Sequence, residues 1–353
     1  GFLAAAEGLK PAGGHHLLQY AADLARSPDG RWWVVADRTQ APSGSGYALE
    51  NRLVVSRVFP QMFRELPVQH LASFFDALRS SLLHWAPRGD GAPRIVLLTP
   101  GPYNETYFEH ALLARYLGFA LAEGNDLTVR DDRVWLKTIS GLERVHAIVR
   151  RQDDDYCDPL ELRSDSALGI AGLTDVARRG NVLLANALGS GVLESGALLG
   201  YLPGLSRALL DEPLAMPSIA TWWLGERAAF EDAWRRPERL IVKPIERSPN
   251  EPSIVVGHLS ADARESLRRR IAERPQHFVA QEWVHVSQAP VLEGTSSALA
   301  ARTVGLRVFA VATPSGWRVM PGGLTRVAGD EDSPVIAMQR GGRSKDTWVL
   351  SDA

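Results

Sequence analysis

The sequence is poor in sulfur and has no long hydrophobic run. Its 353 residues include one cysteine, Cys157, so an intrachain disulfide is impossible, and we expect a reducing compartment and a cytoplasmic location. No apolar run approaches the roughly 18 residues that cross a bilayer, and the first residues lack the basic region of a signal peptide. We therefore expect no membrane contact. Because the chain begins with Gly1 instead of methionine, we also expect that a segment precedes it.

An excess of charge of either sign is also absent. The chain has 39 basic and 41 acidic residues, for a net charge of -2, so no basic surplus points to a nucleic-acid partner. Three common motifs are missing as well. There is no phosphate-loop pattern G-x-x-x-x-G-K-[ST], no hydrolase elbow around Ser190, and no set of histidines at zinc-ligand spacing.

The patterning predicts a mixed fold of strands and helices. The first segment indicates a hairpin, from Leu17–Leu24 through a turn at Ser27–Gly30 to Arg31–Val35, and helices follow from Tyr47 and over Leu71–Leu83. From Ala92, short apolar runs alternate with helical patterns, which predicts an α/β layer with a parallel core. The strands expected there are 94–98, 127–129, 134–136, 147–149 and 182–185, with a helix over 108–117.

Beyond a joint at Pro213–Pro217, the pattern indicates a strand-rich α+β unit. We expect strands over 240–244 and 278–284, a basic amphipathic helix over 261–274, and a hairpin formed by 306–311 and 317–320.

Two of these strands carry residues suited to a nucleotide. Lys243 ends one strand beside a turn-rich loop, Glu246–Glu251, and a lysine there can neutralise a phosphate. Gln281 and Glu282 follow on a strand that can bind an adenine edge and a ribose hydroxyl. A solvent-exposed lysine that merely ends a strand is the alternative.

The expected hairpin near the C-terminus carries arginines among apolar residues. Arg307 lies between Leu306 and Val308, so its side chain should point to the opposite face, where an arginine needs an anion. Arg326 follows on the next strand. Lys345 lies in a glycine-rich basic turn, Gly341–Trp348, which indicates either an anion-binding nest or a surface loop.

Polar residues also follow two buried strands. Arg151, Asp153, Asp154 and Asp155 come after the strand 147–149, and carboxylates at a strand end attract a cation or a basic substrate. An acidic helix-capping turn with arginine partners is the alternative. Asn104 follows the strand 94–98 at the start of a helix, where it indicates either substrate contact or an ordinary cap.

Several long segments resemble one known family. They are Asp37–Gly44 with Tyr47–Arg52, Leu98–His110, Arg150–Arg163, Asn186–Ser195, Val242–Pro244 and Pro321–Val327. In this order they resemble the circularly permuted ATP-grasp proteins (type 2), relatives of glutathionylspermidine synthetase. The resemblance covers the whole chain. It implies an ATP-grasp fold with an additional α/β layer, and ATP-dependent ligation of a carboxylate to an amine through an acyl phosphate.

The resemblance also implies roles for individual residues. Lys243, Gln281 and Glu282 would bind ATP, and Arg326 would stabilise the transferring phosphoryl group. To these we add, from the residue patterns, Lys345 as an ATP-binding candidate and Arg307 beside Arg326. Asp23, with Asp37 as a substitute ligand, would hold magnesium. The candidate substrate-binding residues are Arg38, Ser43, Asn51, Asn104, Arg151, Asp153, Asp154, Asp155, Asn186 and Ser190.

The sequence departs from the wider fold at three points. Ala36-Asp37-Arg38 replaces the usual Glu-x-Asn metal pair, and Arg38 is a candidate to replace a cation outright. The segment Asn186–Ser195 lacks the second lysine, and the loop 247–252 has no glycine to close over phosphates. These departures leave open a degenerate, non-catalytic module that binds a nucleotide or a partner, and a kinase that releases a phosphorylated product.

We therefore expect three segments. Residues 1–90 would form the N-terminal part of the ATP-grasp, 91–211 a substrate-side α/β domain, and 212–353 the ATP clamp and the completion of the fold. The expected partners are a small carboxylate and a small amine, with a nearby-encoded protein or a second copy of the chain as further candidates.

Overall fold

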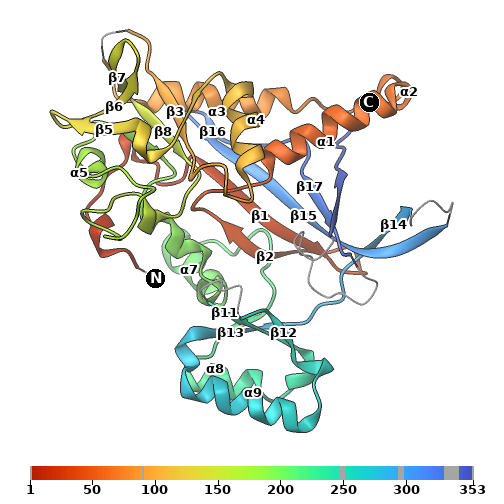
Figure 1. The fold of residues 1–353 in the computed structure, drawn as a ribbon. Coiled ribbons are helices and arrows are strands. Elements are labelled where there is room, and N and C mark those ends of the chain that lie inside the picture. Colours follow the sequence, from red (N-terminus) through yellow and green to blue (C-terminus); the bar gives the residue numbers. More distant parts are fainter. Residues whose placement is uncertain (1, 90, 246–250, 293–297, 330–341, 352–353) are drawn as a thin grey trace.

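A central antiparallel sheet joins the two ends of the chain (Figure 1). The computed structural model describes residues 2–89, 91–245, 251–292, 298–329 and 342–351. The sheet has the strand order β18-β17-β15-β1-β2, and β14 and β16 also pair with β15. Its strands are β1 (Gln19–Arg26), β2 (Trp32–Arg38), β14 (Gln288–Leu292), β15 (Leu299–Thr313), β16 (Gly316–Val319), β17 (Leu324–Val327) and β18 (Arg343–Asp346). The two predicted hairpins, β1–β2 and β15–β16, are both confirmed.

Helices cover both faces of this sheet. Phe309 and Val311 of β15 point into a core shared with α1 (Ser45–Val58) and α3 (Ala72–Trp85), to which Leu49 and Phe75 belong. The short helix α2 (Pro60–Glu65) follows α1. On the opposite face, Ala22 and Val34 pack with α6 (Gly196–Leu199) and α7 (Leu202–Leu210). The strict alternation of strand side chains assigns neighbouring residues of β1 and β15 to these two different environments.

A parallel sheet forms the predicted α/β layer. Its order is β4-β3-β8-β9, with β3 (Ile95–Leu98), β4 (Ala120–Ala122), β8 (Ala147–Arg150) and β9 (Leu183–Ala185). Leu97 packs toward α4 (Tyr107–Leu117), while Val96 packs toward α5 (Leu173–Arg178), so both faces are covered. Burial on both faces explains why these strands are continuous apolar runs in the sequence.

Two predicted strands of this layer lie elsewhere. The strands β5 (Leu127–Arg130), β6 (Arg133–Thr138) and β7 (Gly141–Val145) form a separate antiparallel sheet, so assigning 127–129 and 134–136 to the parallel core is a correction. Only Asp131 and Asp132 separate β5 from β6, both with positive φ, at 48° and 54°. A two-residue connection of this kind makes a hairpin, whereas a parallel pair needs a long crossover.

The third part is a small lobe, drawn below the central sheet in Figure 1. Its sheet has the order β10-β13-β11-β12, with β10 (Thr221–Trp223), β11 (Leu240–Pro244), β12 (Ile254–Val255) and β13 (Phe278–Glu282). The helices α8 (Arg227–Ala233) and α9 (Ala261–Glu273) belong to it, and Leu267 and Ile271 of α9 pack on Leu240 and Ala280 of the sheet. The predicted strands 240–244 and 278–284 and the helix 261–274 are thus present. The division into three segments stays a prediction.

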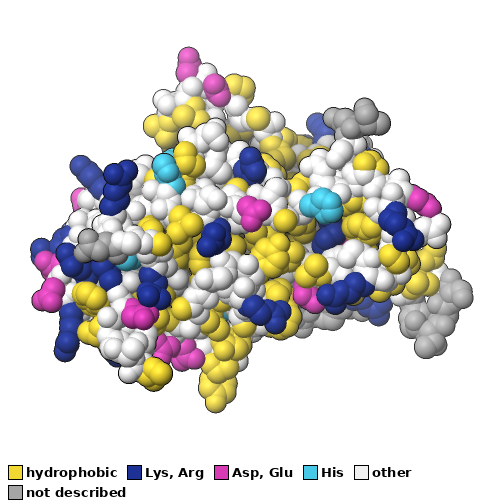
Figure 2. All heavy atoms as spheres, turned by 90° about the horizontal axis from the view of Figure 1, so that it is seen from above, with side chains coloured by type: hydrophobic (Ala, Val, Ile, Leu, Met, Phe, Trp, Pro, Cys, Tyr) yellow, Lys and Arg dark blue, Asp and Glu magenta, His cyan; other side chains and the backbone are white. Residues whose placement is uncertain are grey.

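The surface offers no large region of one charge on the face seen in Figure 2. There, Lys and Arg side chains alternate with Asp and Glu side chains among apolar and neutral ones. Within the described ranges, no helix combines the length and the apolar character that crossing a membrane would require.

Candidate functional site

Strand register brings four charged residues to one face of the central sheet. Asp23 of β1 lies directly opposite Arg307 of β15. Arg38 lies opposite Ala21, two residues before Asp23, and Arg326 lies opposite Gly305, two residues before Arg307. Because side chains two residues apart share a face, all four point the same way. The sequence prediction that Arg307 faces away from its apolar neighbours is confirmed: Leu306 and Val308 pack in the core on the other face.

The anion that Arg307 meets is a carboxylate of the chain itself. Its Nε donates to Asp23 Oδ1 at 2.7 Å and its Nη2 to Oδ2 at 3.0 Å. Arg38 Nη2 donates to Oδ2 at 2.8 Å, and Arg326 Nη2 to Oδ1 at 2.8 Å. We call these three arginines around Asp23 the arginine cluster. It carries two positive charges more than the one carboxylate neutralises.

The cluster is buried, so its charges interact strongly. The side chains of Asp23, Arg307, Arg38 and Arg326 are 8%, 10%, 12% and 18% exposed. Burial by itself would raise the pKa of Asp23, but Arg307, Arg38 and Arg326 outweigh it and hold that pKa well below its ordinary value. Asp23 is therefore a fixed anion that anchors three guanidinium groups. The Nε of Arg326 is buried and has no hydrogen-bond partner among the described residues, which leaves one donor for an incoming anion.

This arrangement does not fit magnesium on Asp23 and Asp37. Both oxygens of Asp23 already accept from guanidinium groups, whose charges would repel a divalent cation. Asp37 pairs with Ala22, so it lies on the opposite face of the sheet, where its carboxylate accepts from the Tyr20 hydroxyl. In the part of the chain that the structure describes, no three His, Cys, Asp or Glu side chains gather as a metal site. The prediction of these two metal ligands is thus corrected by the alternation of β1 and β2.

The small lobe brings its lysine to the same region. Lys243 Nζ donates to Gln281 Oε1, which connects the two predicted nucleotide-binding strands. Gln281 Nε2 donates to Thr221 Oγ1 at 3.0 Å and to the carbonyl of Val35 at 3.4 Å. Val35 lies at an irregularity in the β1–β2 pairing, where a strand carbonyl becomes available to a partner outside the ladder.

Lys243 is close enough to the cluster to respond to its charges. Burial and, after it, the charge of Arg38 lower its pKa to about 8, while the charge of Asp23 opposes both. Together with the contact between Gln281 and the Val35 carbonyl, this indicates that Lys243 lies near the arginine cluster. Glu282 is oriented differently, since its carboxylate pairs with Arg239 at 3.0 Å.

A small cavity adjoins the cluster. It measures about 170 Å³ and is lined by Arg38, Gln40, Ala41, Ser43, Asp153, Glu194 and Arg307. Arg307 Nη1 donates to the Ser43 carbonyl at 2.8 Å, which fixes one wall. Three predicted substrate-binding residues, Arg38, Ser43 and Asp153, therefore share this space with Arg307. We call it the charged cavity.

Other predicted substrate-binding residues hold the walls of the site together. Asn186 accepts from the backbone amides of Leu18 and Gln19 at 2.8 Å each and donates to the Gln19 and Thr39 carbonyls. Ser190 accepts from Arg150 Nη2 at 3.0 Å. Asp154 forms a buried ion pair with Arg150. This matches the alternative weighed for the acidic run, a turn whose carboxylates pair with arginines.

Arg151 has a similar anchoring role. Its Nη1 donates to the Pro42 carbonyl at 2.8 Å, and its Nη2 pairs with Glu109 Oε2 at 3.3 Å. Glu109 Oε1 in turn accepts from the amides of Gly44 and Gly46, at the start of α1. This buried pair therefore fixes the segment that carries Ser43.

The remaining predicted residues lie apart from the charged cavity. Asn104 accepts from the Thr106 amide at 2.9 Å in a local turn before α4, whose N-cap is Thr106, so Asn104 is not the cap weighed as its alternative. Asp155 faces Arg163 at 3.7 Å, and Asn51 accepts from Ser344 at 3.3 Å. Lys345 pairs with Thr325, so it points to the face opposite Arg326, which corrects its placement beside the phosphates. Of the loop 246–251, residues 246–250 lie outside the described residues, as does Gly341 of the basic turn.

Sequence reasoning missed Glu194 and Gln40 in this site. Glu194 Oε1 accepts from the Thr39 and Gln40 amides at 2.8 Å and 2.7 Å, and its Oε2 lies 3.7 Å from Arg38 Nη1. The side-chain oxygen Oε1 of Gln40 accepts from the Asp154 backbone amide. Both residues lie within the segments that carried the family resemblance, which was the available signal.

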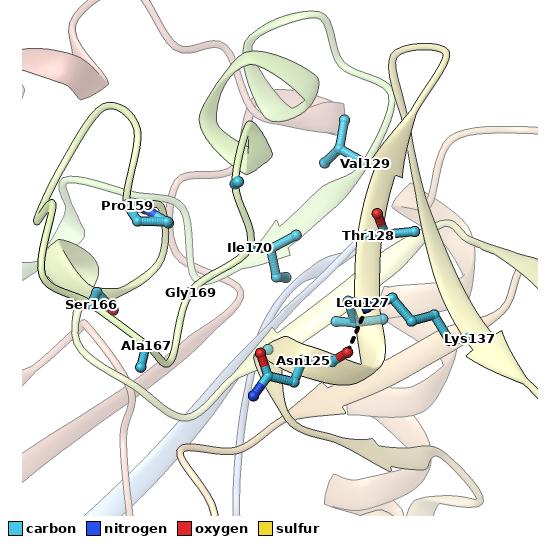
Figure 3. Close-up of a pocket in the computed structure, with 12 residues that line it drawn as sticks. Asn125, Leu127, Thr128, Val129, Lys137, Pro159, Ser166, Ala167, Gly169 and Ile170 are labelled. Carbon is cyan, nitrogen blue, oxygen red and sulfur yellow. Dashed lines mark hydrogen bonds between the residues drawn. The ribbon is translucent and has the colours of Figure 1, made fainter.

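A larger hollow lies away from these residues (Figure 3). It measures about 400 Å³ and is bordered by β5, β6 and the segment from Pro159 to Ala171. Its one charged lining residue, Lys137, donates to the Asn125 carbonyl at 2.8 Å. None of the predicted site residues lines it, so the charged cavity is the better candidate for chemistry.

Comparison with known proteins agrees with this geometry. Residues 1–328 match the family described as circularly permuted ATP-grasp type 2. An uncharacterized protein of Synechocystis sp. is 38% identical over 99% of this chain and 72% of its own length. Two uncharacterized proteins of Mycobacterium tuberculosis are each 39% identical, and this chain spans 39% of one and 62% of the other.

One solved structure has a similar fold. It is a glutathione synthetase-like effector from Globodera pallida in its apo form, with a TM-score of 0.62 at 12% identity over 98% of this chain and 79% of that one. The fold class predicted from the sequence motifs is thereby confirmed.

Proposed function

Because this chain belongs to the circularly permuted ATP-grasp type 2 family, whose fold is typical of ATP-dependent ligases, we propose that it joins a carboxylate to an amine at the expense of ATP. The observation that carries the proposal is the proximity of Lys243 to the arginine cluster, of which Arg38 and Arg307 also line the charged cavity. Lys243 comes from the small lobe, and the arginines come from the central sheet.

Different residues of the site are proposed to bind the nucleotide and to stabilise the phosphoryl group. Lys243 and Gln281 are proposed to bind the nucleotide, because they contact each other at the junction between lobe and sheet. There Gln281 also contacts the Val35 carbonyl, and Lys243 responds to the charges of Arg38 and Asp23. Arg307 and Arg326 are proposed to stabilise the transferring phosphoryl group, since Asp23 fixes their guanidinium groups before any anion arrives and neutralises only part of their charge. Asp23 positions these guanidinium groups and has no metal assigned to it.

The proposed reaction has two steps. A carboxylate oxygen of the first substrate attacks the terminal phosphorus of ATP, the bond to the bridging oxygen breaks, and ADP leaves. A neutral amine then attacks the acyl carbon, phosphate leaves with the bonding electron pair, and the amine loses one proton. Bidentate guanidinium groups suit both the carboxylate and the phosphoryl oxygens.

The experiment is ADP release measured with mixtures of carboxylates and amines, in wild type and Lys243→Ala. A charge-assisted phosphate contact contributes about 1.5–3 kcal/mol, so we expect kcat/KM for ATP to fall about 10- to 100-fold. Lys137→Ala is the matched control, since Lys137 lines the remote hollow. ADP release that depends on the carboxylate but never on an amine, with a stable phosphorylated product, would instead identify a kinase.

One observation favours a second candidate. Asp23 is committed to three arginines, which is what a degenerate ligase that only binds a nucleotide would show. Calorimetry separates the two: tight ATP binding with no ADP release under any mixture identifies the binding module.

A further inference from the structure

We infer that the charged cavity binds a zwitterion, an amino acid, and holds it so that its carboxylate faces the arginine cluster. The inference rests on the proposed function and adds a substrate class to it. It makes the amino acid the acyl donor of the ligation, not the attacking amine.

Charges of both signs line the cavity. Arg38 and Arg307 supply two guanidinium groups, and Asp153 and Glu194 supply two carboxylates. The remaining lining residues, Gln40, Ala41 and Ser43, bear no charge. A polyphosphate here would face two carboxylates, and a polyamine would face two guanidinium groups. A ligand with one charge of each sign meets neither penalty.

Hydrogen-bonding capacity remains on both sides. Arg38 uses Nε and Nη2 for Asp23, while its Nη1 donates no hydrogen bond to a described residue and lies 3.7 Å from Glu194. Oxygen Oε2 of Glu194 accepts no hydrogen bond within the described ranges, since the two backbone amides are taken by Oε1. These two groups lie beyond hydrogen-bond length of each other, so each is available to a ligand.

Asp153 supplies a second acceptor for an ammonium group. Asp153 as a whole residue is exposed, and no described residue donates a hydrogen bond to its carboxylate, unlike the neighbouring Asp154. Partial desolvation of this carboxylate raises its pKa, and the charges of Asp155 and Glu194 raise it further. A cation between Asp153 and Glu194 would relieve that repulsion.

The volume of the charged cavity matches that of a small ligand. About 170 Å³ holds about five water molecules at ~30 Å³ each, which matches an amino acid with a short side chain. With its ammonium at Asp153 and Glu194, the ligand points its carboxylate to Arg38 and Arg307. Arg307 is also one of the two residues proposed to stabilise the transferring phosphoryl group.

The test is calorimetric binding of the twenty protein amino acids, β-alanine and 4-aminobutyrate at millimolar concentration, with and without a non-hydrolysable ATP analogue. Each ligand that binds is compared with its des-amino acid and its decarboxylated amine. We expect one or more to bind, and each analogue to bind at least tenfold more weakly.

The variant Asp153→Asn should abolish the preference for the amino acid over its des-amino analogue. Asp165→Asn is the matched control, because Asp165 is a surface carboxylate paired with Arg163. Two results would overturn the inference: no amino acid binds, or the preference survives in Asp153→Asn. Amino-acid binding without ADP release would refute the ligase and leave the amino-acid site standing.

Discussion

Replacing Asp23 by asparagine tests whether this residue anchors arginines or holds a metal. The substitution keeps the size of the side chain but removes the one negative charge that three guanidinium groups share. Removing one partner of a buried ion pair costs about 3–5 kcal/mol, because the remaining charge stays buried without compensation. We expect a loss of about 4 kcal/mol in the free energy of unfolding.

The corresponding change in melting temperature follows from chain length. At about 2.1 cal/mol/K per residue, the unfolding entropy of a chain of this size is roughly 0.7 kcal/mol/K, so 4 kcal/mol corresponds to about 5 °C. The assay is thermal unfolding of wild type and Asp23→Asn, each in EDTA and in magnesium chloride. Glu231→Gln is the control, since Glu231 forms an exposed pair with Arg227 and should leave the melting temperature unchanged.

The sign of the pH dependence is fixed by the direction of the pKa shift. The folded protein holds the pKa of Asp23 below its ordinary value of 3.8, so its contribution is fully present above that pH and is lost as the pH falls below it. The difference between wild type and Asp23→Asn should therefore be constant near neutral pH and shrink in acid. A variant as stable as wild type in EDTA, combined with a magnesium-dependent stabilisation found only in wild type, would refute the anchoring role.

Three further predictions concern the walls of the site. Nucleotide binding near pH 8 should take up protons, because phosphates stabilise the charged form of Lys243, whose pKa is about 8, and the affinity should fall as the pH rises past 8. Binding heats in buffers of different ionisation enthalpy measure this proton uptake, which Lys243→Ala should lack. The variant Glu109→Ala leaves Arg151 buried without its partner and should cost about 3–5 kcal/mol in denaturant unfolding, with faster hydrogen exchange at Gly44 and Gly46; unchanged exchange at these amides would contradict the anchor. Gly44→Ala should destabilise the fold by about 1–3 kcal/mol, since Gly44 has a φ of 112° and an added Cβ would lie 3.0 Å from Leu324. Gly204→Ala is the control, because open space surrounds Gly204, and equal unfolding midpoints for the two variants would argue against strain at Gly44.

The local parts of the site were predictable from the sequence. Period-two alternation correctly placed Arg307 on the face opposite Leu306, and the predicted strands of Lys243 and Gln281 are indeed paired, while their binding of a nucleotide stays a prediction. The family resemblance located Arg38 and Ser43, which do line the charged cavity. Each of these inferences depends on neighbours in sequence or on a long motif.

The partnerships across the fold were not predictable. Asp23 looked like a free acidic ligand because the arginines that bind it are 284 and 303 residues away, and only strand register aligns them. The amide of Asn186 was assigned to a substrate, although it holds the backbone at Leu18, Gln19 and Thr39. No pattern along the chain reveals a polar side chain that serves as a backbone partner from a distant segment.

The strand order of the central sheet has a consequence for biosynthesis. Asp23 of strand β1 is synthesised 284 residues before its partner Arg307 of the neighbouring strand β15. Until then the acidic residue of β1 has no guanidinium to face, and one edge of the early hairpin is unpaired. Pairing that spans such a distance closes slowly, and exposed edges invite association with other chains. We therefore expect truncations that end between residues 186 and 298 to be retained by chaperones or to aggregate, even though the parallel sheet is complete in them.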